Sequence, residues 1–166
     1  GASNASFYHP KYRKQLKNVY FEGSFNNGPE NRRSSFQLKI DDFSCVLDGE
    51  TITGNLLYRD FEDPLIRGHF KGIVDINSLL DVFPNEVIRT AYGKVVADVR
   101  CDGKISDLKS RLTRDRFKAG GEISLRNLSF ILTGERLPFN GFNGAFIFNK
   151  NDLAISNLTG QVGNSD

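Results

Sequence analysis

The chain has 166 residues, of which 39% are hydrophobic and 25% are charged, a composition typical of a single soluble globular domain. Its 22 basic and 20 acidic residues give a formal net charge of +2, too small to indicate a nucleic-acid partner. No stretch approaches the roughly 18 apolar residues of a membrane-spanning helix, and the chain contains no Met. We therefore expect a piece of a longer polypeptide, with any membrane anchor outside this sequence.

Short runs of Phe, Ile, Leu and Val, separated by Gly, Asn and Asp, predict β-strands along most of the chain. Residues 1–35 are expected to form a partly mobile N-terminal segment that could contain a strand pair. Residues 36–166 are expected to form one β domain. This domain is divided into a first unit at about 36–75, a helix with connecting strands at 76–119, and a second unit at about 120–163.

The stretch FQLKIDDFSCVLDG (36–49) has an irregular hydrophobic pattern. Its apolar residues alternate by two, skip once by three at Asp41–Asp42, and then alternate again. One extra residue in a period-two pattern is typical of a β-bulge, which keeps the same face buried on both sides of the insertion. The stretch GEISLRNLSFILTG (121–134) has the same pattern, with its skip at Arg126–Asn127. We predict a bulged strand in both places.

Two hairpins and one simple strand are predicted from turn residues and alternation. Residues 53–75 predict a hairpin that turns near Asp60–Pro64, and residues 144–160 predict another that turns at Asn149–Asp152. KVVADVRC (94–101) places its Val, Ala and Cys side chains on one face and charged side chains on the other. This alternation predicts a half-buried strand.

One segment has helical rather than strand periodicity. In DINSLLDVFP (75–84) the apolar residues recur at helical spacing, and Pro84 can end a helix. Either Asp75 or Asn77 can serve as the N-cap. We predict one short helix near 76–83.

The hydrophobic pattern is repeated along the chain. The segment from Phe36 corresponds to the segment from Gly121 at an offset of 85, and TGNLLY (53–58) corresponds to NGAFIF (143–148) at an offset of 90. PLIRGHFKGIV (64–74) corresponds to DLAISNLTGQV (152–162) at an offset of 88. Small changes of offset at turns are typical of a structural repeat. A duplicated β unit is favoured over a chance likeness between strands.

The cysteine and histidine residues do not indicate a disulfide or a metal site. Cys45 and Cys101 lie in apolar runs without CxxC spacing, so two free thiols are favoured over a disulfide. His9 lies in the N-terminal segment. His69 alternates with the basic residues Arg67 and Lys71, which opposes a metal site, and it is interpreted as a surface residue. No metal site or cofactor is predicted.

Charged groups coincide with predicted turns and loops. Acidic pairs occur at Asp41–Asp42, at Glu62–Asp63, and at Asp48 with Glu50, and each coincides with a predicted bulge or turn, where Asp is common. The densest basic group, RLTRDRFK (111–118), is interpreted as a solvated strand or loop. No nucleophile elbow, P-loop or dinucleotide fingerprint is present. We therefore predict that the protein is not an enzyme.

Three stretches of the second unit carry a family resemblance: GEISLRNLSF, LPFNGFNGAFIFNKNDLAISNL and TGQVGNSD. Together they resemble the C-terminal region of AsmA-like proteins, and GHFKGIVDINSLLDVFP with GKVVADVRCDGKISDLK resembles the region before it. The resemblance covers about 36–166. It implies a mainly antiparallel, strongly twisted or curved sheet that forms an open or taco-like groove, related to bridge-like lipid-transfer proteins, and it leaves open whether the sheet closes on itself.

The resemblance also implies a function. AsmA-like proteins are anchored in the inner membrane of Gram-negative bacteria and extend through the periplasm, where they serve outer-membrane biogenesis and phospholipid transport. On this hypothesis the partner is a phospholipid or another acyl-chain ligand. The candidate lipid-facing residues are Leu38, Ile40, Phe43, Ile123, Leu125, Leu128, Phe130, Phe146 and Phe148.

Two alternatives stay open. The same nine residues could fill an ordinary closed core, because every β domain needs an apolar face. In function, the alternative is a β-sandwich adhesion module, or a carbohydrate- or protein-binding module, of a secreted protein. An open sheet would also leave edge strands able to pair with a neighbouring copy.

Overall fold

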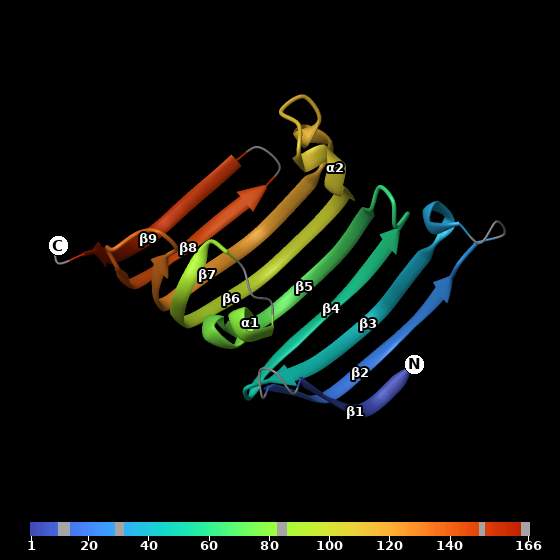
Figure 1. Ribbon diagram of the computed structural model, residues 1–166, viewed down its shortest axis with the longest axis horizontal. Coiled ribbons are helices and arrows are strands. Elements are labelled where there is room, and N and C mark those ends of the chain that lie inside the picture. Colours follow the sequence, from blue (N-terminus) through green and yellow to red (C-terminus); the bar gives the residue numbers. More distant parts are fainter. Residues whose placement is uncertain (10–13, 29–31, 83–85, 150–151, 164–166) are drawn as a thin grey trace.

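The computed structural model describes residues 1–9, 14–28, 32–82, 86–149 and 152–163. These residues form one sheet of nine strands, and the order of the strands across the sheet is their order along the chain (Figure 1). Every neighbouring pair is antiparallel. β1 and β9 are the two edges and do not pair with each other, so the sheet is open. The predicted fold class is confirmed, and the choice that the sequence left between an open and a closed sheet is decided.

The strands are β1 (Ala2–His9), β2 (Lys14–Asn26), β3 (Gln37–Leu47), β4 (Glu50–Arg59), β5 (Leu65–Asp75), β6 (Ile88–Lys104), β7 (Lys118–Leu132), β8 (Phe139–Asn149) and β9 (Asp152–Val162). The helical elements are η1 (Arg33–Ser35), α1 (Ile76–Val82), α2 (Ile105–Leu108) and η2 (Arg114–Arg116). The strands β1 and β2 pair with each other, as the sequence allowed for the N-terminal segment. Only α1 among these helical elements was predicted.

Both predicted bulges are present. The register of β3 against β4 shifts between Ile40 and Phe43, on either side of Asp41–Asp42. The register of β7 against β8 shifts between Leu125 and Leu128, on either side of Arg126–Asn127. Each insertion keeps the hydrophobic side chains before and after it on the same face of the sheet.

The predicted hairpins and the helix are also confirmed. β4 and β5 are joined across residues 60–64, and the β8–β9 hairpin closes with the pair Asn149 and Asp152. Asp75 is the N-cap of α1, because its carboxylate accepts a hydrogen bond from the backbone N–H of Ser78 at 3.1 Å. The predicted helix stop at Pro84 lies outside the described residues.

The two sequence units occupy equivalent places in the sheet. The first corresponds to the consecutive strands β3, β4 and β5, and the second to β7, β8 and β9. β6 lies between them and pairs with both β5 and β7. The proposed repeat therefore maps onto two three-stranded antiparallel meanders.

The sheet curves around α1. This helix contacts β5 and β6, and it also contacts β2, although β3 and β4 lie between β2 and β5 in the sheet. A short helix can reach strands so far apart only if the sheet bends toward it. In Figure 1, α1 lies in front of β5 and β6, near the ends of these strands. The face that carries α1 is therefore concave.

Candidate functional site

The two faces of the sheet differ in polarity. Directly opposed residues of antiparallel strands share a face, so the pairing assigns each side chain. Leu38 pairs with Tyr58, Tyr58 with Ile66, and Ile66 with Gly103. Continued across the sheet, this register gathers most of the Phe, Ile, Leu and Val side chains of β3–β9 on one side, called the apolar face below. The opposite side, called the polar face, carries most of the charges.

All nine candidate lipid-facing residues lie on the apolar face. Three are on β3, four on β7 and two on β8. Each of them is half-buried, and none is fully buried. Strands β4–β6 separate the β3 group from the β7–β8 group, so the structure places the nine on one continuous surface without bringing all of them into contact.

Further side chains complete this face, and those on β4–β6 join the two groups. They are Ile52, Leu56 and Tyr58 on β4, Ile66, Phe70 and Val74 on β5, Val95, Ala97 and Val99 on β6, Phe142 on β8, and Leu153 and Ile155 on β9. None was predicted as a lipid-facing residue, although the alternation in KVVADVRC placed the three β6 residues on one face.

Aromatic rings contact one another on the apolar face. The rings of Phe130 and Phe139 are stacked, with centroids 4.6 Å apart and an angle of 4° between their planes. The ring of Phe142 lies 6.0–6.1 Å from both. On the other side of the sheet centre, the centroids of Phe43 and Phe70 are 6.0 Å apart. Such pairs add roughly 0.5–1.5 kcal/mol beyond area burial and hold the rings in defined positions.

Among the described residues, α1 covers one end of the apolar face. In the described part of the chain, the buried hydrophobic side chains are Cys45, Leu47 and Ala91, all on this face and near the strand ends where α1 lies. Ser78 of α1 is 2% exposed, and its hydroxyl donates a hydrogen bond to the carboxylate of Asp48 in the β3–β4 turn. α1 therefore closes this end, and the rest of the face has no second layer among the described residues.

The polar face is organised by cross-strand ion pairs. Asp98 on β6 contacts two residues of β5: His69 through Nε2 at 2.6 Å, and Lys71 through Nζ at 3.4 Å. The hydrogen bond from His69 is the main cause that lowers the pKa of Asp98. Nearby, Arg67 and Asp102 are paired at 3.0 Å. His69 is thus a surface residue, as predicted, but its partner on the neighbouring strand was not foreseen.

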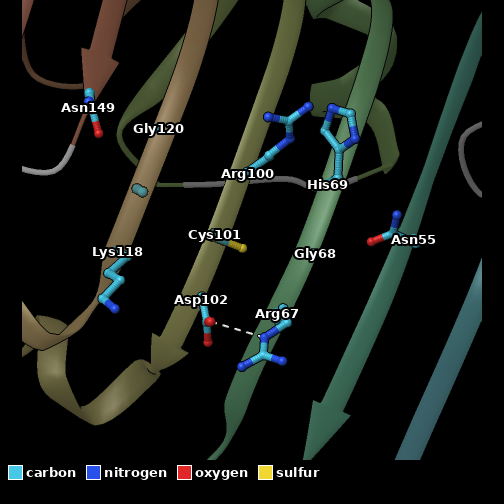
Figure 2. A pocket seen from close by; sticks show the side chains of 11 residues that line it. Asn55, Arg67, Gly68, His69, Arg100, Cys101, Asp102, Lys118, Gly120 and Asn149 are labelled. Atoms are coloured by element: carbon cyan, nitrogen blue, oxygen red, sulfur yellow. Dashed lines mark hydrogen bonds and ion pairs between the residues drawn. The ribbon is translucent and has the colours of Figure 1, made fainter.

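A shallow hollow of about 400 Å³ lies on the polar face (Figure 2). A row of directly opposed residues crosses it from β4 to β8: Asn55, His69, Arg100, Gly120 and Asn149. Gly120 leaves room in the middle of this row, because it has no side chain. The row is polar and open to solvent, and it combines no nucleophile with a base.

The predicted acidic pairs lie in turns and bulges, as expected. Asp41–Asp42 is the β3 bulge, Asp48 has a positive φ of 50° in the β3–β4 turn, and Glu62–Asp63 lies in the β4–β5 turn. Asp63 pairs with Lys104 at 2.6 Å, and this hydrogen bond is the main cause that lowers the pKa of Asp63. These carboxylates stabilise turns and are not gathered around a cleft.

Both cysteines are free, as favoured from the sequence. They belong to the apolar face, where Cys45 opposes Ile52 and Cys101 opposes Gly68. Burial raises the pKa of both thiols, and Cys45 is the more deeply buried of the two. Neither thiol therefore lies in the electropositive surroundings that activate a nucleophilic cysteine.

In the ranges that the structure describes, no three His, Cys, Asp or Glu side chains are grouped as metal ligands. Within the same ranges, no helix has the length and apolar character needed to cross a membrane. Comparison of the chain with protein-family models, with curated proteins and with solved structures found no match.

Proposed function

We propose that this chain is a non-enzymatic part of an AsmA-like bacterial envelope protein, and that its apolar face holds the acyl chains of phospholipids. On this proposal the protein acts in the periplasm of a Gram-negative bacterium in outer-membrane biogenesis or phospholipid transport. Its inner-membrane anchor is supplied by a segment outside the present sequence.

The observation that carries the proposal is the incomplete burial of the apolar face. In a two-layer domain, one apolar sheet face packs against another element and its central side chains become buried. Here nine of its large apolar side chains, on β3, β7 and β8, are only half-buried, although they lie on one face of a nine-stranded sheet. Such a face is suited to an apolar occupant that can enter and leave.

Acyl chains fit the chemistry of this face. Transfer of an acyl chain from a bilayer to water costs about 0.8 kcal/mol for each CH₂ group. A concave surface of Phe, Leu, Ile and Val side chains reduces this cost without recognising a particular headgroup. The polar face, with ion pairs such as Arg67–Asp102, stays in water.

The sheet edges support a continuation of the face beyond this chain. β9 is paired on one side only, and all eleven of its residues are exposed. An unpaired strand edge offers backbone hydrogen bonds to another strand. On the present proposal, β9 pairs with a further strand of a longer polypeptide or with a neighbouring copy, and the apolar face becomes longer.

The single open sheet does not support the alternative of a β-sandwich adhesion module. A sandwich needs a second sheet that packs on the first, and the described residues form one sheet.

The test is native mass spectrometry and lipid extraction of the chain purified from a Gram-negative host. We expect co-purified phospholipid in the wild type, and its loss from the double variant Phe130→Asp/Phe146→Asp. The matched control is Ile147→Asp, because Ile147 follows Phe146 on β8, points to the opposite face and is 49% exposed. Circular dichroism checks that all variants are folded.

A wild-type protein without phospholipid would contradict the proposal. So would equal loss of lipid in the Ile147→Asp control, because binding would then not depend on the apolar face.

A further inference from the structure

The connection between β6 and β7 carries an unusual share of the charge of the chain. Residues 105–118, which are the connection and the first residue of β7 and are called the α2–η2 segment below, contain five basic and two acidic residues, a formal charge of +3. The whole chain has 22 basic and 20 acidic residues and a charge of +2, so all other residues together have a charge of −1. The net positive charge of the chain therefore comes from this one segment.

Most of this charge is free to meet a partner. Arg111, Arg114 and Arg116 are exposed, and none of the described acidic side chains forms an ion pair with them. On the strands, by contrast, Arg67, Lys71 and Lys104 are paired with aspartates. The segment thus presents three unpaired arginines within six residues of the chain.

Two large apolar side chains lie among these cations. Leu112 is 91% exposed, the highest value among the exposed large hydrophobic residues of the described chain, and Leu108 is 51% exposed. Leucine side chains that stay exposed to water do not contribute to the stability of the fold. The same combination is typical of segments that bind the surface of an anionic bilayer, where the cations meet lipid phosphates and the apolar side chains enter the interface.

The segment is ordered and projects from the sheet. It extends beyond the ends of β6 and β7, at the end of the sheet opposite α1 (Figure 1). The backbone N–H of Ile105 donates a hydrogen bond to the carbonyl oxygen of Pro64 at 2.8 Å. The hydroxyl of Thr113 donates a hydrogen bond to the backbone carbonyl oxygen of Asp107 at 3.1 Å. These bonds hold the leucines and arginines in a fixed arrangement, which lowers the entropy lost on docking.

We propose that the α2–η2 segment is a membrane-docking element, which places this end of the sheet on a bilayer that contains anionic phospholipids. Leu108 and Leu112 enter the interface, while Arg111, Arg114 and Arg116 contact the phosphates. The proposal goes beyond the function proposed above and does not require it, because its two leucines and three arginines are not among the residues assigned to the apolar face.

The opposite end of the sheet supplies a matched control. The β7–β8 connection, residues 133–138, contains Leu137, which is 56% exposed, together with the exposed Arg136. Its one acidic residue, Glu135, balances Arg136, so its formal charge is zero. This connection has a comparable exposed leucine without the concentration of positive charge.

The experiment measures co-sedimentation of the chain with vesicles of phosphatidylcholine alone and of phosphatidylcholine mixed with phosphatidylglycerol. Three variants are compared with the wild type: Leu108→Ser/Leu112→Ser, Arg111→Gln/Arg114→Gln/Arg116→Gln, and the control Arg136→Gln/Leu137→Ser. We expect the wild type and the control to bind the mixed vesicles, and not the neutral ones, with an affinity that falls as salt is added. The arginine variant should bind about 100-fold more weakly, from roughly fivefold for each cation removed.

The leucine variant should also lose at least about tenfold in affinity, because buried apolar area adds to binding at the interface. Failure of the wild type to bind the mixed vesicles would overturn the proposal, as would wild-type affinity in the leucine or arginine variant. The Phe130→Asp/Phe146→Asp variant should keep its affinity for vesicles even where it has lost bound lipid. Vesicle binding and lipid retention therefore test the two proposals separately.

Discussion

The side-chain oxygen of Asn143 on β8 accepts a hydrogen bond of 2.8 Å from the backbone N–H of Asn127 on β7. Asn127 is the inserted residue of the β7 bulge and has a positive φ of 49°. Because the bulge removes this N–H from the regular ladder of strand hydrogen bonds, a side chain takes the place of the missing backbone partner. The amide of Asn143 in turn donates to the carbonyl oxygen of Gly141 at 2.8 Å.

The bulge should depend on asparagine at position 127. Asn127→Val should lower the free energy of unfolding by about 1–2 kcal/mol, because a β-branched residue is strained at positive φ. Asn127→Gly is the control and should be nearly neutral, since glycine adopts this conformation freely. Asn143→Ala should cost about 1 kcal/mol through the lost hydrogen bond. Urea unfolding measures all three, and equal stability of the Val and Gly variants would contradict the assignment.

The contact between Asp98 and His69 predicts a loss of stability in acid. The hydrogen bond from His69 lowers the pKa of Asp98 in the folded state. A lowered carboxyl pKa gives a stabilising contribution that is present above the unfolded-state pKa and is lost as pH falls through the folded-state pKa. This loss should occur below about pH 4, the value for Asp in an unfolded chain.

The check is the melting temperature between neutral pH and about pH 3. The melting temperature of Asp98→Asn should fall less in acid than that of the wild type, because the substitution removes the titrating carboxyl group. Asp115→Asn is the control, since Asp115 is exposed and forms no ion pair with the other described residues. Identical acid profiles for Asp98→Asn and the wild type would rule out this linkage.

The thiols should report on occupancy of the apolar face. Both cysteines have a pKa raised by burial, so both should react with a thiol reagent more slowly than a free thiol at neutral pH. Cys101 should react before Cys45, which is more deeply buried. Phospholipid bound to the apolar face should slow the labelling of Cys101 further. Mass spectrometry of single-cysteine variants resolves the two rates, and unchanged labelling of Cys101 in lipid-loaded protein would be evidence against an occupied face at β6.

The attachment of α1 should depend on Ser78. Its buried hydroxyl donates to Asp48, so Ser78→Ala removes a hydrogen bond to a carboxylate and should cost about 1–3 kcal/mol. Hydrogen exchange should increase in residues 76–82 and in the β3–β4 turn. Ser34→Ala is the control for the loss of a serine hydroxyl, since Ser34 is exposed and lies in the 3₁₀ helix η1. Unchanged exchange at α1 in the Ser78→Ala variant would show that other contacts hold the helix.

The sequence by itself determined most of the strands and the helix α1, because their signals are local, whereas η1, α2 and η2 were not predicted. The skips at Asp41–Asp42 and Arg126–Asn127 predicted two bulges that the structure contains. Turn residues predicted the hairpins, and helical spacing after Asp75 predicted α1. Alternation also predicted which side chains share a face, since successive residues of a strand point to opposite sides.

The tertiary structure decided what lies next to what. A period-two alternation of apolar and polar residues does not show whether an apolar face packs on a second sheet or remains open. The strand order from β1 to β9 shows a single open sheet. The contact of His69 with Asp98 and the closure of one end by α1 join residues far apart in the chain. The basic run 111–118 could be read from the sequence as a group of charges. The projection of the α2–η2 segment beyond the sheet, with Leu108 and Leu112 exposed, depends on the path between β6 and β7, which no local pattern specifies.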